Sequence, residues 1–92
     1  MTVRVKLFAN LQELAGTREI QMDADDVAFL LQKLTENYPA LNEEIWKNKE
    51  KSMLVDRIKI MVNGRNIDFL DGLATRLREG DRIAIFPLIA GG

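Results

Sequence analysis

Three stretches of the chain alternate hydrophobic and polar residues, the period-two pattern of a β-strand with one buried face. They are "VRVKLFA" near the start, "RIKIMV" in the middle and "RIAIF" near the end. In the last stretch Ile83 and Ile85 fall on one face, so Phe86 faces the opposite side. The pattern therefore predicts three strands and places one aromatic ring outside the core.

Between the first two of these strands, the hydrophobic period changes from two to that of a helix. The recurring hydrophobic positions are Val27, Leu30, Leu31, Leu34 and Tyr38. Asp25 and Asp26 precede this stripe, and either carboxylate can cap the first turn of a helix. Pro39 prevents simple continuation. The sequence therefore predicts one main helix from about residue 27 to residue 38, and "ALNEEIW" after it is expected to add a short helical turn.

Turn signals complete the order of elements. We expect a short helix "LQELA" that is capped by Asn10 together with Glu13 and ends at Gly16. The polar segment "TREIQMD" is expected to be an outer strand. Asn63-Gly64 favours a type I′ hairpin turn followed by a short returning strand over residues 66–68. The predicted order is β-α-β-α-β-β-β, which corresponds to an α+β domain of two layers.

Composition and charge limit the partners that the chain can attract. Thirteen Lys and Arg residues oppose fourteen Asp and Glu residues among 92, which leaves a net charge of −1. No global basic field attracts nucleic acid or an anionic membrane, so neither is an expected partner. No apolar stretch approaches the roughly 20 residues that span a bilayer. We therefore expect a cytoplasmic protein.

The residue types that are missing limit the chemistry of the side chains. The chain has no cysteine and no histidine, which removes the thiolate nucleophile, the usual general base and the commonest metal ligand. Neither glycine-rich phosphate motif, GxxxxGK[ST] or GxGxxG, occurs. No metal site is expected, because the aspartates fit helix caps and turns.

Three segments, "KLFANLQELAG", "VNGRNI" and "EGDRIAIFPLIAGG", closely resemble the MoaD-like small subunit of molybdopterin synthase. That family belongs with the ubiquitin-like β-grasp sulfur carriers, which include archaeal members that also act as protein modifiers. The resemblance implies a mixed sheet of four to five strands packed against one main helix, with the first and last strands parallel at the centre. We expect a β-grasp domain over residues 1–87 and a flexible diglycine tail over residues 88–92. Two positions depart from the family pattern: Leu88 replaces a second proline, and Gln12 stands where arginine is frequent.

The resemblance also implies a chemistry at the carboxyl terminus. An E1-like adenylating enzyme, similar to MoeB, uses ATP to activate the carboxylate of Gly92, and sulfur then replaces one oxygen to give a thiocarboxylate. A larger, MoaE-like subunit uses this group to install the dithiolene sulfurs of molybdopterin. The chain itself would be a non-catalytic subunit without a stably bound cofactor. Two alternatives remain: a ubiquitin-like modifier that joins Gly92 to target lysines, and the sulfur carrier of thiazole synthesis.

The terminal residues suit this chemistry physically. A terminal carboxylate has a pKa of about 3.3–3.7, so it is ionised in the cell and must be activated before sulfur can displace an oxygen. Gly91 and Gly92 lack a Cβ and can enter a narrow channel. Leu88, Ile89 and Ala90 are expected to form an apolar spacer inside the partner. From Pro87 onward the tail can span roughly 20 Å.

Four residues of the domain are predicted to contact the partner that receives the tail. Phe86 faces away from the core, and Pro87 should end strand pairing and direct the tail outward. Phe8 is out of phase with Leu7 and neighbours Phe86 if the first and last strands pair. Ile67 is assigned to the same surface, with packing in the core as the alternative. Trp46, by contrast, is expected to be a packing anchor of the core.

Overall fold

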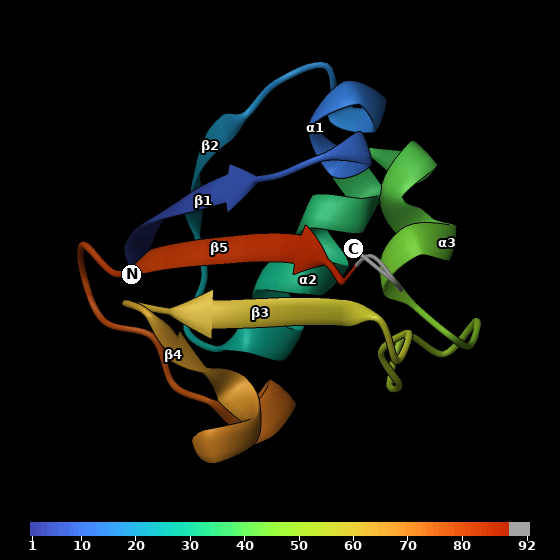
Figure 1. Ribbon diagram of the computed structural model, residues 1–92. Coiled ribbons are helices and arrows are strands. Elements are labelled where there is room, and N and C mark those ends of the chain that lie inside the picture. The colour runs from blue at the N-terminus through green and yellow to red at the C-terminus, as the bar shows by residue number, and fades with distance from the viewer. Residues whose placement is uncertain (89–92) are drawn as a thin grey trace.

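The computed structural model describes residues 1–88 of the chain. These residues form five strands and three α-helices (Figure 1). In chain order they are β1 (Thr2–Leu7), α1 (Asn10–Ala15), β2 (Glu19–Asp23), α2 (Val27–Asn37), α3 (Asn42–Ile45), β3 (Ile58–Val62), β4 (Arg65–Asn66) and β5 (Arg82–Pro87). Three single 3-10 turns lie at Pro39–Leu41, Ile67–Phe69 and Gly72–Ala74.

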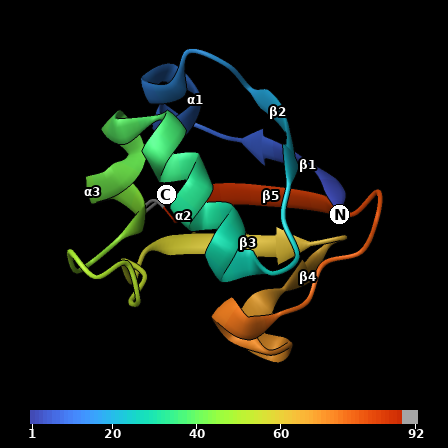
Figure 2. The same ribbon diagram turned by 180° about the vertical axis from the view of Figure 1, so that it is seen from behind.

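The five strands form one mixed sheet in the order β2-β1-β5-β3-β4. The first and last strands, β1 and β5, are parallel neighbours, and every other pairing is antiparallel. Figures 1 and 2 show the sheet from its two sides, with α2 crossing only one of them. These observations confirm the expected α+β architecture with parallel strands at the centre and one main covering helix.

The core lies between α2 and the face of the sheet that α2 covers. Four of the five residues of the predicted hydrophobic stripe are fully buried, Val27, Leu30, Leu31 and Leu34, and the fifth, Tyr38, packs partly buried against the core just after α2. The inward residues of the strands, among them Val5, Ile60 and Ile85, close the core from the other side. Trp46 is buried as expected, and its indole N–H donates to the Oγ1 atom of Thr35 over 3.1 Å.

Aspartate side chains close helix ends and turns, as the sequence predicted. The Oδ1 atom of Asp26 accepts the backbone N–H of Phe29 at 2.8 Å, which satisfies a free donor in the first turn of α2. Before β5, the Oδ2 atom of Asp81 accepts the backbone N–H of Arg78. In residues 1–88, no helix is long and apolar enough to cross a membrane.

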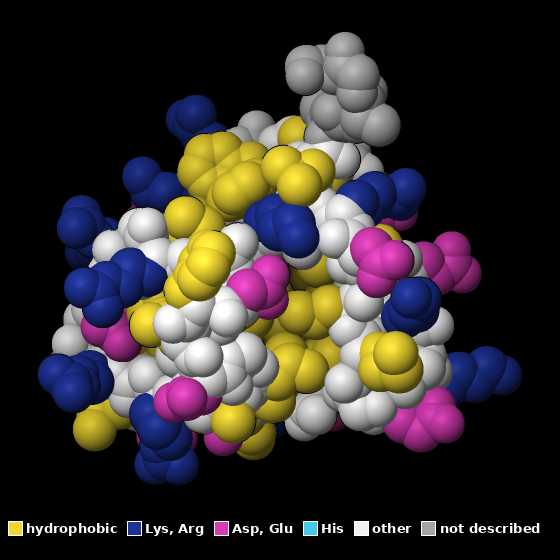
Figure 3. All heavy atoms as spheres, turned by 60° about the horizontal axis from the view of Figure 1, so that its bottom comes forward, with side chains coloured by type: hydrophobic (Ala, Val, Ile, Leu, Met, Phe, Trp, Pro, Cys, Tyr) yellow, Lys and Arg dark blue, Asp and Glu magenta, His cyan; other side chains and the backbone are white. Residues whose placement is uncertain are grey.

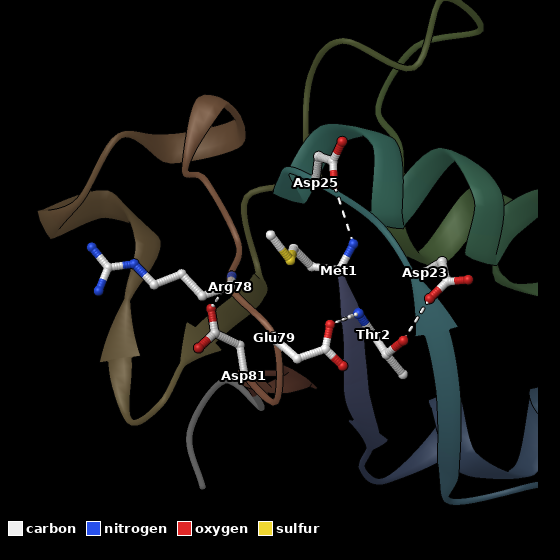
Figure 4. Close-up of polar contacts among 7 residues, drawn as sticks. All are labelled: Met1, Thr2, Asp23, Asp25, Arg78, Glu79 and Asp81. Carbon is white, nitrogen blue, oxygen red and sulfur yellow. Dashed lines mark hydrogen bonds and ion pairs between the residues drawn. The ribbon is translucent and has the colours of Figure 1, made fainter.

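The beginning of β1 is tied to three other segments (Figure 4). The amino group of Met1 lies 3.2 Å from the Oδ1 atom of Asp25. The backbone N–H of Thr2 donates to Glu79, and its hydroxyl donates to Asp23 on β2. These contacts hold the start of β1 against β2, against the loop before α2 and against the loop before β5.

Two local predictions are wrong. Asn10 does not cap α1: the cap position is Ala9 without a side-chain hydrogen bond, and the amide of Asn10 donates to Glu44 instead. The returning strand β4 is only two residues long and begins earlier than expected. The Oδ1 atom of Asn66 accepts the N–H of Asp68 and starts a 3-10 turn there. In both places the asparagine side chain makes a hydrogen bond other than the one that the local pattern predicts.

Candidate functional site

Strand β5 presents Phe86 on the face of the sheet that α2 does not cover. Ile83 and Ile85 are buried, whereas Phe86 is only half-buried, as the alternation predicted. The ring of Phe8, which follows β1, packs edge-to-face against Phe86, with ring centroids 6.3 Å apart and an interplanar angle of 89°. Phe8 remains 43% exposed, so this aromatic pair belongs to the surface.

A strained turn after β1 positions Phe8. Its backbone N–H donates to the carbonyl of Ile85, which fixes the end of β1 against β5. The next residue, Ala9, has a φ of +55°, in a region that favours glycine. In a residue other than glycine, such a conformation costs about 1–3 kcal/mol of conformational free energy, and it tends to occur at functional sites. The strain therefore lies directly beside the aromatic pair.

The two rings border a shallow apolar depression, which we call the aromatic cluster. It is lined by Phe8, Ala9, Ala84, Phe86 and Pro87. Figure 3 shows hydrophobic side chains gathered near the end of the described chain, with Lys and Arg side chains around them. Ala84 and Ala9 were missed by the sequence analysis. The alternation of β5 could have identified Ala84, whereas nothing in the sequence signals the positive φ of Ala9.

Strand pairing does not end at Pro87, which corrects the prediction. Pro87 is still paired with Ile58, and beyond it the backbone N–H of Leu88 donates to the carbonyl of Arg57 over 2.7 Å. A second proline at position 88 would lack this donor. The departure from the family pattern therefore allows β5 and β3 to stay hydrogen-bonded one residue further.

The prediction that Ile67 contacts a partner is wrong. Only 3% of its surface is exposed, because it packs into the core at the start of the 3-10 turn after β4. The neighbouring Phe69 takes the solvent-facing position and is 87% exposed. The 3-10 turn Ile67–Phe69 thus directs Ile67 inward and Phe69 outward.

Of the predicted tail residues, only the first, Leu88, lies among the residues that the structure describes. Leu88 is exposed and follows the aromatic cluster directly. The other predicted tail residues, Ile89, Ala90, Gly91 and Gly92, lie outside the described residues. Within residues 1–88, no group of three or more acidic side chains is arranged to hold a metal ion.

Comparison with known proteins identifies the family. The model of the ThiS family matches residues 5–92. The chain belongs to the ThiS family. Its fold is that of the ubiquitin-like β-grasp proteins, as shown by the solution structure of the small archaeal modifier protein 1 from Methanosarcina acetivorans. That structure aligns with a TM-score of 0.88 and 46% identity, over 99% of this chain and 96% of the other.

Relatives of the chain carry two kinds of name. Small archaeal modifier protein 3 of Haloferax volcanii is 32% identical over the full length of both chains. The sulfur carrier protein CysO of Mycobacterium tuberculosis is 29% identical over 84% of this chain and 83% of its own. The chain is thus similar both to proteins named as modifiers and to proteins named as sulfur carriers.

Proposed function

We propose that the chain is a sulfur carrier whose reacting group is the carboxyl of Gly92. The observation that carries the proposal is the aromatic cluster at the end of the central strand β5, directly before the terminal residues. An exposed, closely packed aromatic pair is typical of a docking surface. A partner seated there receives the tail, and the chain's own side chains take no part in the bond changes.

The first step is activation by a separate adenylating enzyme. A carboxylate oxygen of Gly92 attacks the α-phosphorus of ATP, a new phosphorus–oxygen bond forms, and pyrophosphate leaves. The mixed anhydride makes the carbonyl carbon electrophilic, which the carboxylate is not. ATP is a substrate of that enzyme and not a resident cofactor of this chain.

The second step introduces sulfur without a change of oxidation state at the carbon. A sulfide equivalent attacks the carbonyl carbon, the carbon–sulfur bond forms, and AMP leaves with the bridging oxygen. The product is a thiocarboxylate, whose sulfur is a much better nucleophile than the original oxygen. On the resemblance to the MoaD-like subunits, its acceptor is the pterin precursor of molybdopterin, held by the larger, MoaE-like subunit.

A second candidate function begins from the same acyl adenylate. If the amine of a target lysine attacks the carbonyl carbon, AMP leaves and an isopeptide bond joins the chain to the target. The full-length similarity to small archaeal modifier protein 3 favours this alternative. The carrier of thiazole synthesis shares the first two steps and differs only in the final acceptor.

Reconstitution with the host's adenylating enzyme tests the proposal. The wild-type chain is expected to support exchange of labelled pyrophosphate into ATP, and a variant that lacks Gly92 is expected to lose at least about 100-fold of this rate. Asp26→Ala serves as the control, because it weakens α2, which lies on the side of the sheet opposite the aromatic cluster. Equal exchange by the wild type and the shortened variant would contradict the proposal.

A further inference from the structure

Along β1 and β5 the exposed face of the sheet changes from apolar to cationic, although Lys59 of β3 lies beside Phe86. Parallel pairing places Arg4 directly beside Arg82 and Lys6 beside Ala84, while the next outward residues are Phe8 and Phe86. Because outward positions repeat every two residues, Arg82 and Phe86 are separated by roughly 13 Å along β5. The two groups therefore belong to one continuous surface.

The cationic end contains a depression of about 500 Å³. Its charged lining residues are Arg4, Lys6, Arg82 and a single carboxylate, Glu19. Within residues 1–88, Glu19 lies 3.9 Å from Arg4, and both side chains are about half-exposed or more. Such an ion pair contributes little, so it does not neutralise the three cations. We call Arg4, Lys6 and Arg82 the cationic trio.

The positive charge of this arrangement is compensated only in part, because Glu19, the register partner of Lys6 and the ion-pair partner of Arg4, is a single carboxylate beside three cations. Arg4 and Arg82 are register partners on neighbouring strands, and like charges directly opposite each other are destabilising in a sheet. The net charge of the chain is only −1, so the trio is a local feature and not part of a generally basic surface. A local positive cluster that one carboxylate compensates only in part suits an acidic binding partner.

The shape of the site favours a protein surface over a small anion. Sites for phosphate or similar anions generally use backbone N–H groups of a helix start or a nest. The strands around the trio instead direct their N–H groups within the plane of the sheet, toward one another. The depression also lies on the same face as the aromatic cluster, so one broad partner can cover both.

We propose that the cationic trio is a steering site for an acidic surface of the adenylating enzyme that activates Gly92. The proposal rests on the function proposed above. A carrier must bind and leave in every cycle, and charge attraction raises the association rate more than it raises final affinity. The trio therefore guides the encounter, and the aromatic cluster makes the close contact next to the tail.

The test compares two double variants in pyrophosphate exchange at several salt concentrations. Lys6→Gln with Arg82→Gln removes two charges from the trio. Lys33→Gln with Lys49→Gln removes the same charge from α2 and from the loop before β3. At low salt we expect the first double variant to lose about tenfold in kcat/KM through a higher KM, and to show a flatter salt dependence. The control double variant should match the wild type.

Other outcomes overturn the proposal in distinguishable ways. No exchange by the wild type at any salt concentration would contradict the proposed function itself. Wild-type exchange with an unchanged salt dependence in the first double variant would contradict the steering site alone. Two further results would also contradict the steering site alone, provided that the trio variant keeps the wild-type exchange rate. One is that the variant loses binding to a short RNA oligonucleotide. The other is that it loses a salt-dependent self-association measured by sedimentation.

Discussion

The two faces of β5 differ in burial: one packs into the core, and the other faces the uncovered side of the sheet. Ile83 and Ile85 are buried beneath α2, whereas Arg82, Ala84 and Phe86 point to the side that α2 leaves uncovered. The inward residues contribute to stability, because each removes apolar surface from water. The outward residues gain little from the fold, so their arrangement is better explained by contact with a partner. The comparison predicts that substitutions on the two faces have separable effects.

The largest effect on stability is expected inside the core. Ile85→Ala removes buried methyl and methylene groups at a fully buried position and should lower the free energy of unfolding by about 2–5 kcal/mol. Urea unfolding followed by circular dichroism measures the change. At a temperature where the variant remains folded, its KM in pyrophosphate exchange should equal that of the wild type. A loss below about 1 kcal/mol would contradict the assignment of this face to the core.

The outward face should show the reverse behaviour. Phe86→Ala removes one ring of the aromatic pair and is expected to weaken docking by at least about 2 kcal/mol, which is about 30-fold in KM. Its cost in unfolding free energy should be smaller than that of Ile85→Ala, because Phe86 is only half-buried. An unchanged KM would contradict the assignment of Phe86 to the docking surface.

A variant that loses stability but keeps docking tests whether the two faces of β5 have separate roles. Asp26→Ala removes the side-chain cap of α2 and should cost about 1 kcal/mol in unfolding free energy. Because α2 lies on the covered side of the sheet, KM should not change. Asp26→Ser is the matched control, since serine can restore the hydrogen bond to the N–H of Phe29. A raised KM in the alanine variant would show that stability alone affects docking.

The smallest effect is expected where β5 ends. Leu88→Pro removes the N–H that donates to Arg57 and should cost about 0.5–1.5 kcal/mol. Leu88→Ala keeps this donor and is the matched control. Amide hydrogen exchange of the β3–β5 pairing should increase in the proline variant alone. Equal exchange in both variants would contradict the extension of pairing beyond Pro87.

Much of the fold followed from periodicity alone. The buried stripe of α2 and the outward position of Phe86 were both predicted, since burial requires the spacing of a helix or a strand. The parallel pairing of β1 with β5 came from the family resemblance, because local patterns do not determine which strands become neighbours. The contact between Phe8 and Phe86 could be predicted only by assuming that β1 and β5 are neighbours.

The errors arose where a side chain or a turn overrides the local pattern. Asn10 fits a capping sequence, but it bonds to Glu44, which lies far along the chain. For Ile67 the sequence left both a surface role and core packing open, and the 3-10 turn after β4 places it in the core. The cationic trio was not predicted, because its members come from two strands and only the parallel register brings them together.

The central claim is that the chain acts through the carboxyl of Gly92 and not through its side chains. Its most direct test is the intact mass of the protein purified from its native host, with fragmentation of the terminal residues. The account predicts a population that is heavier by one oxygen-to-sulfur exchange, located at Gly92. A chain found only with an unmodified carboxylate or in conjugates with lysine would contradict the sulfur-carrier function.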